Sequence, residues 1–79
     1  MSPEQCRAAR GWLDWSQDQL AGAAGVSLST VRDFEKGRRT PIAATLKAMK
    51  TVLAENGIEF LDGEPSGITF SRPEKVAAP

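Results

Sequence analysis

The stretch from Ser16 to Gly37, SQDQLAGAAGVSLSTVRDFEKG, decides how this chain folds. It contains the same pattern twice: a serine, a run of helix-forming residues and a glycine. A serine side chain accepts hydrogen bonds from the first backbone N–H groups of a helix, and a glycine adopts the left-handed conformation in which helices commonly end. We therefore expect one helix between Ser16 and Gly25 and a second, over residues 28–36, that starts after Ser27 and stops at Gly37.

Neighbouring residues support both helix starts. Gln19, three residues after the first serine, completes a capping box, and Trp15 is placed to pack on Leu20 as a hydrophobic staple. Val26 precedes the second serine and is placed to pack on Val31 in the same way. Each helix therefore has its own start signal, and the turn between them is short.

Two further helices flank this pair. Ser2 and Pro3 suit an N-cap and a first helical residue, which predicts a helix over residues 3–13. Pro41 opens another helix, predicted over residues 42–55 and ended by an Asn-Gly pair. The residues at helical spacing are predicted to face the core: Cys6, Ala9 and Leu13 in the first helix, and Ile42, Leu46, Met49, Val52 and Leu53 in the last.

The sequence period changes after the last helix. Two short β-prone runs, residues 58–61 and 68–71, flank turn-forming residues and predict a hairpin with a loop of five or six residues. An isolated hairpin is marginally stable in water, so this one must pack on the helices or pair with another chain. The chain thus divides into a helical domain (1–56), the hairpin (57–71) and a segment predicted to be disordered (72–79).

The charge of the chain is unevenly distributed. With 79 residues it is one small domain, and its formal net charge is zero. Between residues 27 and 50, however, six basic residues accompany two acidic ones. A local basic patch, rather than the total charge, is typical of a nucleic-acid binder. Charges on helix surfaces can also be merely solvated, and the composition leaves both interpretations open.

The residue types exclude several kinds of site. The chain has no histidine and one cysteine, so an intrachain disulfide, the common zinc sites and Ser-His or Cys-His nucleophiles are ruled out. We expect no enzyme activity, no cofactor and no metal, and we interpret Cys6 as a small core residue rather than a reactive thiol. We expect no signal peptide, and no apolar run in the sequence reaches membrane-spanning length. With its single cysteine, a cytoplasmic protein is expected.

Two short helices joined by a tight turn form a helix-turn-helix, whose second helix lies in the DNA major groove. The positions that support this interpretation are Arg10, Ser16-Gln17, Leu20-Ala21, Gly25-Val26-Ser27, Val31, Phe34-Glu35, Gly37 and Arg38 to Pro41. Together they resemble the Cro/phage-repressor family, also called the XRE family, over about residues 4–55. The resemblance implies an all-α fold, a compact four-helix domain. The short C-terminal β-hairpin or extended tail departs from the pattern, because most members have a fifth helix there.

The resemblance implies a structural role for two charged residues. Arg10 and Glu35 occupy positions where many family members have a salt bridge between helices. The residues themselves support this role, because a charge close to the buried stripe of the first helix needs a partner. Glu35 adjoins Phe34 and is placed to supply that partner. The alternative is that Arg10 contacts DNA.

Other positions match phosphate contacts of the family. Gln17 lies at a helix N-terminus, which attracts anions, although a plain capping role is the alternative. The basic loop after the second motif helix matches the segment that lies along the DNA backbone. Such contacts set register and affinity without reading the sequence. The expected phosphate contacts are Gln17, Lys36, Arg38, Arg39 and Thr40.

Base contacts are expected from the exposed N-terminal part of the second motif helix. Arg32 can bind guanine O6 and N7, Leu28 can meet a thymine methyl group, and Asp33 can accept a hydrogen bond from cytosine N4. An exposed Arg32–Asp33 salt bridge without DNA contact is the alternative. The expected base contacts are Leu28, Ser29, Arg32 and Asp33.

Trp12 lies off the buried stripe of the first helix, and a lone exposed tryptophan is unusual. Our hypothesis is that hairpin residues Phe60, Ile68 or Phe70, or a second subunit, cover it.

These expectations lead to a sequence-specific regulator that binds double-stranded DNA. The family implies a repressor that acts as a homodimer on a two-fold-related operator, with half-sites about 34 Å apart. The alternative is an antitoxin-like or antiactivator module that keeps this fold and binds a protein partner through the hairpin edge.

Overall fold

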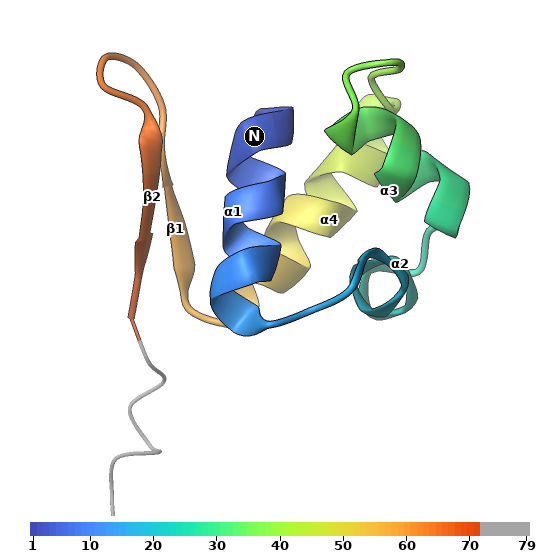
Figure 1. Ribbon diagram of the computed structural model, residues 1–79, viewed down its shortest axis with the longest axis horizontal. Helices are drawn as coiled ribbons and strands as arrows, with labels where there is room; N and C mark the ends of the chain where they lie inside the picture. The colour runs from blue at the N-terminus through green and yellow to red at the C-terminus, as the bar shows by residue number, and fades with distance from the viewer. Residues whose placement is uncertain (72–79) are drawn as a thin grey trace, which may run out of the picture.

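The computed structural model describes residues 1–71, which form four helices and a two-stranded antiparallel sheet (Figure 1). The predicted four-helix fold with a C-terminal hairpin is confirmed. The disorder expected for residues 72–79 concerns a segment outside the described residues. The elements are α1 (Pro3–Leu13), α2 (Gln17–Ala24), α3 (Leu28–Glu35), α4 (Ala43–Glu55), β1 (Ile58–Leu61) and β2 (Gly67–Phe70).

Serines begin the first three helices. Ser2, Ser16 and Ser27 are the N-caps of α1, α2 and α3, and each side-chain oxygen accepts the backbone N–H three residues further on. Gln5 and Gln19 complete capping boxes at the first two, because each side-chain oxygen accepts the N-cap N–H at 2.8 Å. No side-chain hydrogen bond caps α4. Short-range signals therefore place three of these helix starts.

Left-handed residues follow the first three helices. The two predicted glycines end α2 and α3 with φ angles of 73° and 74°. After α3, the Gly37 N–H donates to the Phe34 carbonyl at 3.0 Å and the Arg38 N–H to the Asp33 carbonyl at 2.9 Å, which is a Schellman motif. Helix α1 instead ends at Asp14, whose φ of 59° places a non-glycine residue in the left-handed region.

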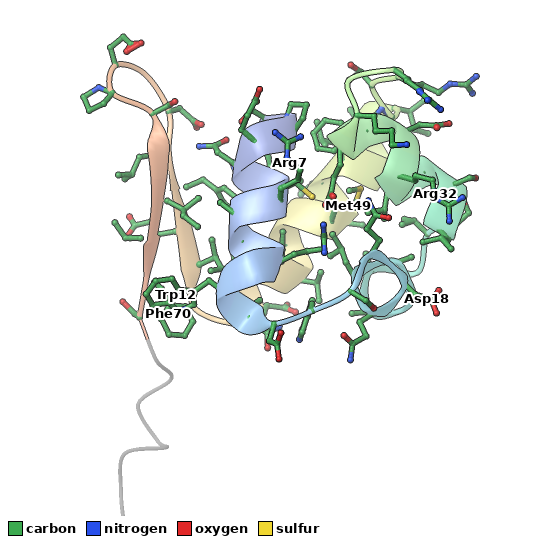
Figure 2. The ribbon with its side chains drawn as sticks, viewed as in Figure 1. Arg7, Trp12, Asp18, Arg32, Met49 and Phe70 are labelled. Atoms are coloured by element: carbon green, nitrogen blue, oxygen red, sulfur yellow. The ribbon has the colours of Figure 1, made fainter. Side chains whose placement is uncertain are left out.

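One apolar core joins the four helices and the first strand. In Figure 1, α1 lies between the hairpin and the α2–α3 pair, with α4 packed across them. Met49, near the middle of α4, points into the centre of the molecule (Figure 2). The buried residues are Cys6, Ala9, Leu20, Ala21, Val31, Phe34, Met49, Leu53 and Ile58.

One residue predicted for the core is exposed. Ile42 is 73% exposed, so its assignment to the buried stripe is wrong. It is the N-cap residue of α4, and its extended backbone (φ −64°, ψ 159°) precedes the helix. Its side chain therefore does not continue the apolar face on which Leu46 and Val52 pack against the core.

The hairpin packs on the helices of its own chain. Ile58 lies opposite Phe70 and Phe60 opposite Ile68, and these four side chains are buried or partly buried. On each strand, the residue between these two side chains is exposed: Glu59 on β1 and Thr69 on β2. This is the alternation of a sheet with one covered face. The covered face contacts α1 and α4.

Gln5 fastens the loop end of the hairpin to α1. Its side-chain nitrogen donates to the Leu61 carbonyl at 2.9 Å and to the Gly67 carbonyl at 2.8 Å, one on each strand. Its side-chain oxygen accepts the Ser2 N–H, so the buried amide is well satisfied. The role of Gln5 was not predicted. The Ser2–Gln5 spacing was readable as a capping box, but the contacts with the strands were not.

Trp12 lies at the other end of the hairpin (Figure 2). Its ring centroid is 5.2 Å from that of Phe70, with a tilt of 42° between the rings. Phe70 thus covers one side of the indole, as the hypothesis allowed, but Trp12 is still 61% exposed. Phe60, another candidate, lies instead under the Lys50 ammonium, which is 5.5 Å from the ring centroid.

Candidate nucleic-acid interface

The two faces of α3 differ in their surroundings. Val31, Phe34 and Glu35 are buried, whereas Ser29 and Arg32 are exposed. Arg32 points away from the core in Figure 2. The remaining two residues expected to meet bases, Leu28 and Asp33, are partly exposed. Helix α3 therefore presents all four expected base contacts at least partly to solvent.

No ion pair joins Arg32 to Asp33 in residues 1–71, where the one pair is Arg10–Glu35. The alternative interpretation of Arg32 and Asp33 as a surface salt bridge is therefore not realised. The two side chains therefore do not neutralise each other.

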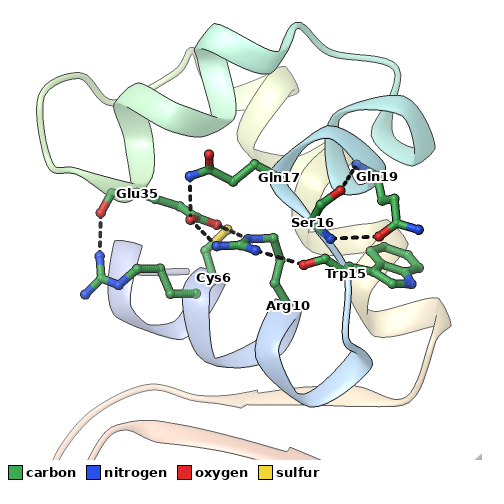
Figure 3. A network of polar contacts seen from close by, with 8 residues as sticks. Cys6, Arg10, Trp15, Ser16, Gln17, Gln19 and Glu35 are labelled. Carbon is green, nitrogen blue, oxygen red and sulfur yellow. Dashed lines mark hydrogen bonds and ion pairs between the residues drawn. The ribbon is translucent and has the colours of Figure 1, made fainter.

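A buried carboxylate anchors the end of α3 (Figure 3). Glu35 is 2% exposed, and both of its side-chain oxygens bind Arg10, with Nε 2.7 Å from Oε2 and Nη2 2.8 Å from Oε1. Cys6 Sγ donates to Oε2 at 3.1 Å, and Gln17 Nε2 donates to Oε1 at 3.1 Å. The carboxylate thus joins α1, α2 and α3.

These contacts determine the protonation states within the network. Burial alone would raise the pKa of Glu35, but hydrogen bonds from Arg10, Cys6 and Gln17 outweigh it and lower that pKa. The hydrogen bond with Glu35 raises the pKa of Arg10. Burial, with the neighbouring carboxylate, raises the pKa of the Cys6 thiol. Cys6 is therefore a neutral donor in this network, the opposite of a reactive thiolate.

Two further hydrogen bonds extend the network to the backbone. Arg10 Nη1 donates to the Trp15 carbonyl at 2.8 Å, in the connection between α1 and α2. Arg7 Nη1 donates to the Glu35 carbonyl at the end of α3. The role of Arg7 was not predicted, because its position off the apolar stripe gave no signal. Together the two arginines hold the helix-turn-helix against α1.

Gln17 makes a contact that the sequence did not predict. Its amide nitrogen donates to Glu35, as described above, and the side chain is partly buried. An amide nitrogen carries two N–H groups, so this bond leaves one for another acceptor. The residue therefore combines an internal contact with a position at the N-terminus of α2.

The basic loop adjoins the exposed face of α3. Lys36, Arg38, Arg39 and Thr40 are all exposed. A shallow hollow of about 260 Å³ lies between α3 and the start of α4. It is lined by four of the residues predicted to contact DNA, namely Ser29, Asp33, Arg39 and Thr40. The other predicted DNA contacts lie outside it. Its lining is Ser29, Thr30, Asp33, Arg39, Thr40, Pro41, Ile42 and Thr45.

In the described part of the chain, no group of three or more His, Cys, Asp or Glu residues is placed to hold a metal ion. No helix there has the length and apolar character needed to span a membrane.

Comparison with known proteins finds a matching family. Residues 7–59 match a family described as helix-turn-helix. An uncharacterized HTH-type transcriptional regulator of Archaeoglobus fulgidus is 41% identical over 63 residues. The aligned part covers 80% of this chain and 25% of that protein, so the chain spans about a quarter of its relative's length. The family match contains every residue of the candidate interface.

Proposed function

This chain belongs to the Cro/phage-repressor (XRE) family of helix-turn-helix transcription regulators, and from that membership we propose that it is a cytoplasmic repressor that binds a specific double-stranded DNA sequence as a homodimer. The observation that carries the proposal is the contrast between the two faces of α3. Glu35 is buried in a network of hydrogen bonds, whereas Ser29 and Arg32 are exposed. A helix held in this way can enter the major groove with its polar face forward.

The exposed residues of α3 would read the bases. Arg32 suits guanine, to which a guanidinium donates two hydrogen bonds. Leu28 suits a thymine methyl group, and Asp33 suits the cytosine amino group. Ser29 suits either a donor or an acceptor, because a hydroxyl group can play both parts.

The surrounding polar residues would bind the phosphates. Arg38, Arg39 and Thr40 form an exposed loop beside α3, and Lys36 precedes it. Gln17 has an N–H group available at the N-terminus of α2. Each phosphate neutralised by a cation releases counterions, so binding would weaken steeply with salt.

A homodimer supplies the second reading helix. A single α3 covers a few base pairs, whereas two copies related by a two-fold axis would read two half-sites about 34 Å apart. The experiment that tests the proposal is selection of duplexes from a random pool by the purified protein, followed by measurement of stoichiometry on the selected site. We expect an enriched two-fold-related sequence bound by two chains. No enrichment over the starting pool would contradict sequence-specific binding, and one chain per site would contradict the homodimer.

The sign of regulation needs a separate measurement. We expect a reporter gene whose promoter contains the selected site to be expressed less when the protein is present. Increased expression would leave DNA binding intact and make the protein an activator.

A second function is favoured by exposed apolar residues beside the hairpin. Trp12 and Leu61 are large hydrophobic residues with 61% and 40% exposure, and they lie at opposite ends of the hairpin. Together with a strand edge, exposed apolar residues suit a protein partner, as expected for an antitoxin-like or antiactivator module. A stable heteromeric complex from a protein that enriches no DNA sequence would support this alternative over the first.

A further inference from the structure

Three hydroxyl groups share one network in the first turn of α3. Ser27 Oγ lies 2.7 Å from Thr30 Oγ1 and 3.2 Å from Ser29 Oγ. It also accepts the Thr30 backbone N–H at 3.1 Å. Ser27 and Ser29 are exposed, and Thr30 is partly buried. Thr30 belongs neither to the expected base contacts nor to the expected phosphate contacts, yet it adjoins the residue that would read a base.

The numbers of donors and acceptors on these three hydroxyl groups favour one direction of hydrogen bonding. A hydroxyl group has one proton to donate and two lone pairs that accept. One lone pair of Ser27 takes the Thr30 N–H. In residues 1–71, the only hydrogen-bond partner of the Thr30 hydroxyl is Ser27, so a proton donated there fills the second lone pair. The Ser27 proton is then left for Ser29.

The reverse direction is less favourable. If Ser29 donated to Ser27 and Ser27 to Thr30, the Thr30 proton would need an acceptor other than Ser27 from a partly buried position. Leaving such a group without a partner is costly. The partly buried position of Thr30 thus favours the direction from Thr30 through Ser27 to Ser29, which leaves the Ser29 proton for an outside acceptor.

We propose that Thr30, acting through Ser27, makes Ser29 a hydrogen-bond donor toward the base that it reads. This inference rests on the proposed function, because it requires Ser29 to meet a base edge. A proton that stays available on Ser29 favours acceptors in the major groove, such as guanine N7 and O6, adenine N7 or thymine O4. Without the Thr30 hydroxyl, Ser27 can accept the proton of Ser29, and Ser29 then loses the proton with which it would bind these acceptors.

The variant that tests the inference is Thr30→Val. It keeps the branched shape and the backbone N–H that Ser27 caps, and it removes only the hydroxyl. Affinities would be measured for the selected duplex and for duplexes with each other base at each position. Ser29→Ala identifies the position that Ser29 reads. Thr30→Ser restores the hydroxyl, and Thr51→Val makes the same substitution at an exposed position of α4.

We expect Ser29→Ala to lose the preference at one position. Thr30→Val should weaken the preference at that same position about 3- to 10-fold, the value of one hydrogen bond. Affinity for unrelated DNA should stay unchanged, Thr30→Ser should restore the preference, and Thr51→Val should resemble the wild type.

The remaining outcomes distinguish a failure of this inference from a failure of the proposed DNA-binding function. If Ser29→Ala loses a preference that Thr30→Val keeps, the relay is wrong and the DNA-binding function stands. If Thr30→Val weakens binding to all sequences equally and lowers the melting temperature, Thr30 is a structural residue and the relay is again wrong. If Ser29→Ala changes no preference, Ser29 reads no base, and the inference fails with that contact. If the wild type prefers no sequence, the proposed function itself fails.

Discussion

Arg10 holds Glu35 by both carboxylate oxygens, at 2.7 Å and 2.8 Å, and thereby ties the last turn of α1 to the last residue of α3. The carboxylate is almost fully buried, whereas the arginine side chain is 18% exposed. The buried negative charge of Glu35 is therefore tolerated only because hydrogen bonds surround the carboxylate. Helix α3 is held at this end by polar contacts and along its inner face by apolar packing.

Removing the arginine should destabilise the fold. Arg10→Ala leaves a buried carboxylate without its main partner, which costs about 3–5 kcal/mol of unfolding free energy. Urea denaturation measures this loss. Arg32→Ala is the matched control, because that exposed arginine has no ion-pair partner among residues 1–71, and its stability should stay within about 0.5 kcal/mol of the wild type. Unchanged stability of Arg10→Ala together with lost DNA binding would instead make Arg10 a DNA contact.

The same carboxylate makes stability depend on pH in acid. The pKa of Glu35 is lowered in the folded protein, so the stability that its charge contributes is present above the unfolded pKa of about 4.3. That contribution is lost as the pH falls through the lower, folded pKa. We expect the unfolding free energy of the wild type to decrease below about pH 4.3.

Other carboxylates titrate in the same range, so the informative quantity is a difference. Glu35→Gln removes the titrating group and keeps the shape of the side chain. The stability gap between wild type and Glu35→Gln should narrow as the pH falls from 6 toward 3, the range that spans glutamate titration. A gap that is constant over this range would show that ionisation of Glu35 does not stabilise the fold.

Replacing Asp14 with glycine should stabilise the protein. Asp14 has a φ of 59° at the C-terminal end of α1, where a side chain is strained and a negative charge faces the negative end of the helix dipole. Asp14→Gly removes both costs, for a gain of about 1 kcal/mol. Thermal denaturation should show a melting temperature higher by about 4–8 °C.

The control for this prediction is an aspartate-to-glycine substitution at the N-terminal end of a helix. Asp18 is exposed in the first turn of α2, where its charge is favourable and its backbone is helical. Asp18→Gly should therefore lower the melting temperature. If both glycine variants changed stability in the same direction, the explanation from backbone conformation would be wrong.

Gly57 should be required for the hairpin. Its φ is 100°, and a Cβ placed there would collide with the backbone oxygen of Ser71. The Ser71 N–H also donates to the Gly57 carbonyl at 2.8 Å, so the two strand ends meet at this residue. We expect Gly57→Ala to cost more than about 2 kcal/mol and to speed amide hydrogen exchange in β1 and β2. Gly67→Ala, in a strand position with open space around it, should leave exchange nearly unchanged.

Arg32 and Arg39 should affect DNA binding in different ways. Arg32→Ala should relax the preference at one base pair, by about 1–3 kcal/mol of discrimination, because a guanine contact is lost. Arg39→Ala should weaken binding to all sequences and reduce the salt slope by about one, because a phosphate contact is lost. Lys47→Ala, on the exposed side of α4, is the control and should do neither. Equal weakening on all sequences by Arg32→Ala would make it a phosphate contact.

The order of elements and most of their ends could be predicted from the sequence. A serine followed by a glutamine three residues later, or a glycine after a helical run, acts within one turn of the chain. Such signals placed α2 between Ser16 and Gly25 without knowledge of the fold. The partnership of Arg10 and Glu35 was expected from the family resemblance and from the cost of a charge near the core. The structure adds its geometry.

The remaining contacts depend on how distant segments meet. Gln5 binds the backbone of residues 61 and 67, and no local pattern records which carbonyls the hairpin brings to it. Ile42 continued the helical spacing of α4, yet it became exposed because the helix began one residue later. The sequence by itself thus determined the helices, the turn and the charges on α3, since these follow from neighbouring residues. Only the tertiary structure decided that Gln5 binds both strands of the hairpin and that Ile42 is exposed. It also decided that Arg7 and Gln17 join the Glu35 network. These contacts follow from the path of the whole chain.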